Sequence, residues 1–217
     1  QLQWARPRFG RQARFFANGD VLLAAGNELM RLKGSNGDLI WVRNLLELRP
    51  DPGTVAFQLP VEPGASLALS LHFAEFTAAG NPVFPDPVLV SLDSATGALQ
   101  WELTRTASSS QVSEACAPVR IGADQVHAYL ERGSAQVDAV IERRSGSTGA
   151  LQWSTRIAAV EFTQEDEACE LLATSNLVAF SSRSGALSTL IALNHAGELQ
   201  WRSTLPSGLP AELRAAP

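Results

Sequence analysis

A short motif that ends in tryptophan recurs along the sequence. Its clearest copy occupies residues 93–101, DSATGALQW, and related copies occupy residues 145–153, 194–201 and, more weakly, 34–41. The last three residues of one more copy stand at positions 2–4, so the motif contains all five tryptophans of the chain: Trp4, Trp41, Trp101, Trp153 and Trp201. They are 37 to 60 residues apart, and repeats of about 40–50 residues are typical of propellers, arrays and solenoids.

Each repeat contains four short runs that predict β-strands. In the third repeat the runs are apolar or alternate between apolar and polar residues, and turn-forming residues separate them; they occupy residues 115–121, 125–130, 136–141 and 150–157. No stretch has the sustained 3.6-residue period of a helix. Four strands joined by such turns predict an antiparallel meander. The sequence therefore predicts an all-β protein, a β-propeller built of four-stranded antiparallel blades.

The repeats divide the chain, taken as a single propeller segment, into four predicted blades. These blades span residues 5–44, 45–105, 106–157 and 158–205. Residues 1–4 are expected to be the last strand of a preceding blade, and residues 206–217 a tail or the start of a next blade. The second blade is the longest because it contains residues 76–87, a stretch rich in Gly, Pro and Asn that predicts an insertion loop.

The residue types of the motif suit a hairpin that docks one blade on the next. A glycine precedes each complete tryptophan by four residues, at Gly37, Gly97, Gly149 and Gly197. A hairpin turn often needs a positive φ, which glycine adopts without a steric penalty. A leucine stands two residues before each tryptophan, which on a regular strand places both on one face. The tryptophans could form a ligand-stacking floor, but their presence in every repeat favours packing between blades.

The motif resembles the pyrroloquinoline-quinone-like (PQQ-like) repeat, whose units run from a hydrophobic strand ending in Ala-Leu-Asp through a Thr-Gly turn to a strand with tryptophan. Residues 91–101 match this pattern, and residues 192–201 match it with a turn one residue shorter. Departures are Lys33 and Ser145 at the aspartate position, and Glu142, Arg143 and Arg144, which disturb an apolar strand. The family includes quinone-dependent dehydrogenases and the outer-membrane-assembly lipoprotein, so the resemblance implies a periplasmic, extracellular or cell-surface protein.

Propellers of this family usually have seven or eight blades, so the resemblance implies that the four repeats form an incomplete arc of a larger propeller. A closed four-bladed ring is the alternative. Further blades would come from another part of the polypeptide or from a second chain, and open blade edges would allow self-association. Consistent with a processed or excised piece, the chain begins at Gln1 without a methionine or a signal sequence.

Charge and hydropathy exclude some classes of partner. The net charge is -5, and the arginines are dispersed without forming a patch. Nucleic acid is therefore not expected, because its binding usually requires a basic surface. No segment has the apolar length needed to span a bilayer.

Few residues outside the motif suggest chemistry. Cys116 and Cys169 end two copies of Glu-Ala-Cys that lie 53 residues apart in adjacent repeats. They could form a disulfide if their Cα atoms lie within about 4.4–6.8 Å, but two free buried cysteines are slightly favoured. The acidic residues 165–167 favour a solvated loop over a cation site. His72, His127 and His195 are isolated, with no metal-ligand spacing.

We therefore expect no catalytic, cofactor-binding or metal-ligating residues, and the leading hypothesis is a non-catalytic scaffold that binds a protein or a surface ligand. One alternative is a fragment of a quinone-dependent dehydrogenase, which would need PQQ and calcium. Another is a structural module of a larger surface protein. Recognition is expected in the parts that do not recur in every repeat: residues 76–87, the Glu-Ala-Cys pair and the acidic residues 165–167.

Overall fold

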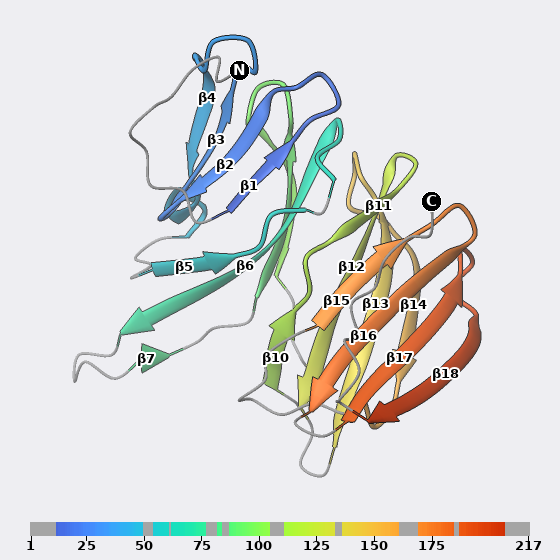
Figure 1. Cartoon of the computed structure of the whole chain (residues 1–217). Helices are drawn as coiled ribbons and strands as arrows, with labels where there is room; N and C mark the ends of the chain where they lie inside the picture. The colour runs from blue at the N-terminus through green and yellow to red at the C-terminus, as the bar shows by residue number, and fades with distance from the viewer. Residues whose placement is uncertain are drawn as a thin grey trace. The chain divides into compact units, whose positions relative to one another are not determined.

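The computed structural model describes residues 12–49, 54–60, 62–76, 82–83, 87–104, 111–132, 136–160, 169–184 and 187–206. These residues form four antiparallel sheets, which we call blades 1 to 4, and one 3-10 turn, η1 (Leu45–Leu48) (Figure 1). Blade 1 consists of β1 (Gln12–Phe15), β2 (Val21–Ala25), β3 (Glu28–Leu32) and β4 (Leu39–Asn44). Blade 2 consists of β5 (Thr54–Phe57), β6 (Ser66–Phe76), β7 (Pro82–Val83), β8 (Val88–Asp93) and β9 (Leu99–Thr104). Blade 3 consists of β10 (Gln111–Ala115), β11 (Val119–Ile121), β12 (Asp124–Arg132), β13 (Val137–Ser145) and β14 (Leu151–Ile157). Blade 4 consists of β15 (Cys169–Ala173), β16 (Leu177–Ser184), β17 (Leu187–Asn194) and β18 (Leu199–Pro206).

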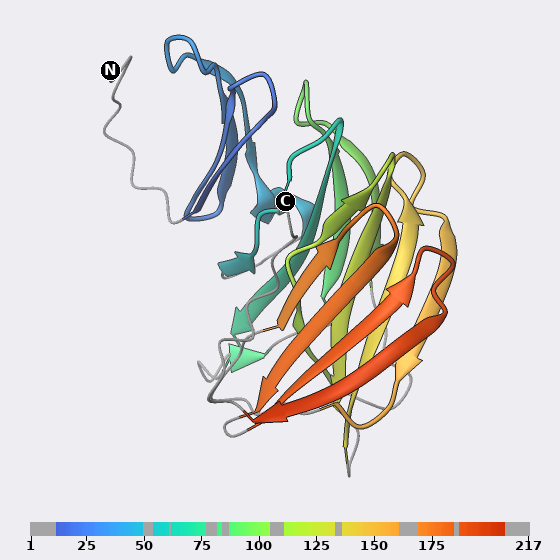
Figure 2. The ribbon, with the colours of Figure 1, turned by 45° about the vertical axis from the view of Figure 1, so that its right-hand side comes forward.

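The chain divides into two compact units, each with two blades. The first unit, Gln1–Arg105, contains blades 1 and 2, and the second unit, Thr106–Pro217, contains blades 3 and 4. Within the second unit the ribbons of the two blades lie face to face (Figure 2). The boundary between the units falls where the sequence separates the second predicted blade from the third.

Each unit has its own hydrophobic core between its two blades. In the first unit alternate residues of β6, including Leu67, Leu69 and Leu71, are fully buried against residues of blade 1 such as Leu22 and Leu29. In the second unit the core joins alternate residues of β12 and β13 to residues of β16 and β17. Burial of each such side chain contributes about 1.5–3 kcal/mol, so the pairing of blades inside a unit is strongly stabilised.

The motif forms the hairpin between the last two strands of each blade. Asp93 Oδ1 accepts hydrogen bonds from the backbone N–H groups of Ala95 and Thr96 and from the Thr96 hydroxyl. The hydroxyl hydrogen bond, followed by the backbone ones, lowers the pKa of Asp93. Gly97 then takes φ 72°. In blade 4 the amide oxygen of Asn194 accepts from two backbone N–H groups in the same way.

A β-bulge follows this hairpin in all four blades. In blade 1 Arg31 pairs with Trp41 whereas Leu32 pairs with Leu39, so one extra residue lies between the leucine and the tryptophan. The other blades have the same register shift. Strict alternation of faces is lost at a bulge. The four motif leucines are accordingly 37% to 50% exposed. The expectation that leucine and tryptophan lie on one face is wrong, because they pair with adjacent residues of the neighbouring strand.

The strands differ from the predicted ones mainly at their ends. The first strand of the third repeat is predicted from residue 115, but β10 already begins at Gln111, and the short strand β7 lies inside the predicted insertion loop. Strand β13 continues through Glu142, Arg143 and Arg144, which the sequence comparison treats as a disturbance. The reason is that Arg144 forms a buried ion pair with Glu142 (2.8 Å), while Arg143 lies between them in the strand and makes other contacts. Residues 1–4, the acidic residues 165–167 and residues 207–217 lie outside the described residues.

Candidate functional site

Trp41 joins blade 1 to the hairpin of blade 2. Its indole is 8% exposed and lies against Gly97, where an added Cβ would be 2.8 Å from Cδ2 and Cε3 of the indole. The indole Nε1 donates a hydrogen bond to the Ser94 carbonyl at 2.8 Å. Packing and hydrogen bonding therefore both depend on a hairpin without a side chain at position 97.

Trp153 makes the same contact between blades 3 and 4. A Cβ added to Gly197 would be 2.7 Å from Cδ2 of Trp153. The indole Nε1 donates to the His195 carbonyl at 2.9 Å. The structure thus brings together four of the residues predicted for docking, Trp41 with Gly97 and Trp153 with Gly197.

The other predicted docking residues have different surroundings. Trp101 is buried in β9, and Gly37 and Gly149 have φ values of 73° and 72°. Trp201 occupies the corresponding place in β18 but is 46% exposed. Trp4 lies outside the described residues.

An arginine strengthens each of these two contacts, and in blade 1 it is Arg31, for which the sequence suggests no role. Arg31 Nε and Nη2 donate to Asp20 Oδ2 at 3.0 and 2.6 Å, and Nη1 donates to the Ser94 carbonyl at 2.9 Å. That carbonyl is also the acceptor for Trp41. We use the name clamp for this set of contacts, in which Asp20, Arg31 and Trp41 on one blade hold the Ser94 carbonyl on the next.

The clamp recurs between blades 3 and 4. Arg143 Nε and Nη2 donate to Asp124 Oδ2 at 3.0 and 2.6 Å, and Nη1 donates to the His195 carbonyl at 3.1 Å. Arg143, which looks like an interruption of an apolar strand, is therefore an inter-blade contact. A signal was present in the sequence, because Arg31 and Arg143 each precede a motif tryptophan by ten residues.

The aspartate of the first clamp is held in its charged form. The Gly34 N–H donates to Asp20 Oδ1 at 3.0 Å, and this hydrogen bond is the main cause that lowers the pKa of Asp20. The hydrogen bonds from Arg31 and Asn18 lower that pKa further, against the opposing effect of burial. The Arg31 guanidinium also lies over the Phe16 ring, 4.2 Å from its centroid. The guanidinium is thus fixed from several sides before it reaches the neighbouring blade.

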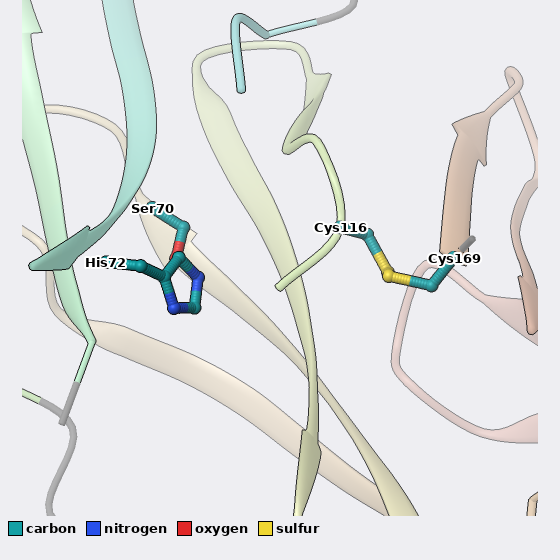
Figure 3. Close-up of a disulfide and its surroundings, with 4 residues drawn as sticks. All are labelled: Ser70, His72, Cys116 and Cys169. Carbon is teal, nitrogen blue, oxygen red and sulfur yellow. A yellow bond between two sulfur atoms is a disulfide. The ribbon is translucent and has the colours of Figure 1, made fainter. Parts of the chain in front are cut away.

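Cys116 and Cys169 form a disulfide in the structure, one of the two interpretations that the sequence left open (Figure 3). Cys116 follows β10 and Cys169 begins β15, so the bond links blades 3 and 4. Their Cα atoms are 5.2 Å apart, within the usual range, and both side chains are buried. The favoured interpretation, two free cysteines, is not the state in the structure.

Each of the three histidines has its own surroundings. His72 on β6 lies 3.5 Å from the Ser70 hydroxyl (Figure 3), longer than the roughly 2.6–3.2 Å of a nucleophile–base pair. Burial lowers the pKa of His72, which favours its neutral form. His127 is buried on β12, and His195 Nε2 lies 3.0 Å from the Thr174 carbonyl oxygen.

No group of metal ligands can be assigned in the described ranges. Among these residues, no three His, Cys, Asp or Glu side chains come together as a metal-binding group. We therefore derive no chemical step through calcium or PQQ. Within the same part of the chain, no helix has the length and hydropathy needed to cross a membrane.

Replacing Trp41 by phenylalanine tests the docking contact. The indole N–H bond to Ser94 is lost while most of the ring packing stays, so we expect the free energy of unfolding to fall by about 1–2 kcal/mol. Urea denaturation followed by circular dichroism measures this loss. Trp201→Phe is the matched control and should change it by less than about 0.5 kcal/mol, because Trp201 is largely exposed. Equal losses in both variants would show that the hydrogen bond to the next blade is unimportant.

Comparisons with known proteins support the fold. No protein-family model and no curated protein matches the sequence. A europium-containing methanol dehydrogenase has a similar structure, with a TM-score of 0.50 and 8% identity over 92% of this chain and 46% of that chain. Two further structures are less similar. BamB from Moraxella catarrhalis has a TM-score of 0.42 and 11% identity over 94% of this chain and 67% of that chain. The WD40 domain of SCAP from fission yeast has a TM-score of 0.44 and 12% identity over 92% of this chain and 46% of that chain.

These identities are low, so the likeness concerns the fold alone. The described residues form four blades of antiparallel strands in an all-β propeller fold. It spans about half of the methanol dehydrogenase chain and about two thirds of the BamB chain.

Proposed function

We propose that the chain is a non-catalytic scaffold of PQQ-like repeats, part of a larger propeller, that binds another protein through the outer face of blade 4. The observation that carries this proposal is the contrast between equivalent tryptophans. Trp41 is 8% exposed because the hairpin of blade 2 covers it, whereas Trp201 is 46% exposed. A large exposed aromatic side chain is the type of residue that dominates protein interfaces.

The surroundings of Trp201 support the same surface. Trp201 pairs with Ala192 on β17, whereas the neighbouring Ile191 and Leu193 belong to the core shared with blade 3, so Trp201 lies on the other face of the sheet. The contacts of Trp41 and Trp153 define what fits an indole in this position: a hairpin with a glycine at positive φ and a carbonyl that accepts from Nε1. The partner that we propose is therefore another blade of this kind on a second protein chain.

The disulfide supports a proposal for the compartment. Disulfides persist in oxidising surroundings such as the periplasm and the cell surface and are rare in reducing cytosol. The buried Cys116–Cys169 bond therefore favours a periplasmic, extracellular or cell-surface location.

Self-association of the purified chain tests the binding surface, because a second copy supplies blades with the required hairpins. Sedimentation velocity over a range of concentrations should show reversible association. Trp201→Glu should weaken it at least about tenfold, since it places a charge in an apolar contact. The control Gln200→Glu changes the neighbouring exposed residue and should leave it unchanged.

Two outcomes would contradict the proposal. A chain that stays monomeric at all concentrations, with no difference between the two variants, would remove the evidence for a docking face on blade 4. Oxidation of an added alcohol with matching reduction of an electron-acceptor dye, after addition of PQQ and calcium, would favour the alternative, a fragment of a quinone-dependent dehydrogenase.

A further inference from the structure

The two units have a second inter-blade contact in common besides the clamp. In the first unit the Gln12 side chain reaches from β1 to blade 2, where Nε2 donates to the Phe57 carbonyl at 3.4 Å and Oε1 accepts from the Leu59 N–H at 3.0 Å. In the second unit the disulfide joins Cys116 to Cys169. We call this contact near the first strands of the blades the inner tie.

The inner tie occupies equivalent positions of blades 1 and 3. Gln12 pairs with Ala24, which follows the clamp residue Asp20 by four positions. The Cys116 N–H donates to the carbonyl of Ala128, which follows the clamp residue Asp124 by four positions. Gln12 and Cys116 therefore link their blade to the next one from equivalent positions, Gln12 through hydrogen bonds and Cys116 through a disulfide.

The receiving positions in blades 2 and 4 are also equivalent. In blade 2 the start of the motif hairpin is marked by Asp93, which pairs with Ser66. Phe57 pairs with Leu71, which follows Ser66 by five residues. In blade 4 Cys169 pairs with Ser182, five residues after Leu177, which lies opposite Asn194 at the start of its hairpin.

The clamp arginine is present in alternate blades only. The residues paired with the four described motif tryptophans are Arg31, Ser91, Arg143 and Ala192 in blades 1 to 4. Serine and alanine cannot donate to a carbonyl of a neighbouring blade as a guanidinium does. Blades 1 and 3 are therefore alike as donors, and blades 2 and 4 are alike as acceptors.

From this alternation we infer that the structural repeat of this chain is a pair of blades, and that each pair unfolds as one cooperative body. Each pair has a core of its own, an inner tie near the first strands and a clamp at the last hairpin. A blade held at both ends against its partner cannot separate without breaking the core and both contacts together, which makes separation all-or-none.

Native-state hydrogen exchange of the full chain, read by mass spectrometry in low denaturant, tests this inference. Arg143→Met keeps the aliphatic stem but removes the charge-assisted bonds across the pair. We expect the slow amides of both blade 3 and blade 4 to exchange about 10- to 100-fold faster, and those of blades 1 and 2 to change less than twofold. Arg31→Met should have the reverse effect.

Two further variants keep the test decisive. Arg120→Met on β11 is the control, because this exposed arginine lies in the same unit and should leave exchange unchanged. Asp124→Asn weakens the same clamp more gently and should show the same pattern at smaller size if Arg143→Met folds poorly. Faster exchange confined to a single blade, or spread equally over all four blades, would overturn the inference.

Discussion

Replacing Gly197 by alanine is expected to lower the free energy of unfolding of the second unit by about 2–5 kcal/mol. Two effects add. At φ 84° an alanine pays about 1–2 kcal/mol for the left-handed conformation. Its Cβ would also lie 2.7 Å from Cδ2 and 2.8 Å from Cε3 of Trp153, and forcing atoms into a packed contact costs about 1–3 kcal/mol more. Urea denaturation followed by circular dichroism measures the sum.

Gly122→Ala separates the two effects. Gly122 is in the same unit with φ 60°, and a Cβ there would meet no atom within 4 Å. It should therefore show the conformational cost alone, about 1–2 kcal/mol. Similar losses in the two variants would mean that the contact with Trp153 adds nothing, and that the glycine is required only by the turn.

Gly197 also illustrates what the sequence could predict. A glycine at a fixed distance before tryptophan indicates a hairpin with positive φ, and this conformation is found at Gly37, Gly97, Gly149 and Gly197. Local spacing carries this information because the turn and the strand that follows it are adjacent in the chain. For the same reason the four-stranded meanders could be predicted, with errors mainly at strand ends.

Contacts between blades were harder to predict. The partner of Arg143 is a backbone carbonyl 52 residues away, and carbonyls have no sequence signature. Its charge departs from the apolar pattern of the strand, and the aspartate that balances this charge, Asp124, lies on the neighbouring strand 19 residues away in the sequence. The exposure of the motif leucines depends on a β-bulge, which a regular two-residue alternation cannot anticipate.

Loss of the disulfide is expected to destabilise the second unit by about 4 kcal/mol. The bond closes a loop of 53 residues, and the chain-entropy relation assigns about this free energy to a loop of that length. The expected result is a fall of this size in the free energy of unfolding, measured by urea denaturation, for the double variant Cys116→Ala/Cys169→Ala. Transitions that belong to blades 1 and 2 should not change, since the first unit contains no cysteine.

Single variants decide whether the bond itself is the cause. If the bond is what stabilises the unit, Cys116→Ala and Cys169→Ala should each cost nearly as much as the double variant, because either one removes it. Reductant should then destabilise the wild type by a similar amount and leave the double variant unchanged. Additive single losses, with no effect of reductant on the wild type, would instead mean that the cysteines stabilise the core only by their packing. Because the same position of the first unit is bridged by Gln12, which no reductant affects, only the pair formed by blades 3 and 4 should respond to reduction.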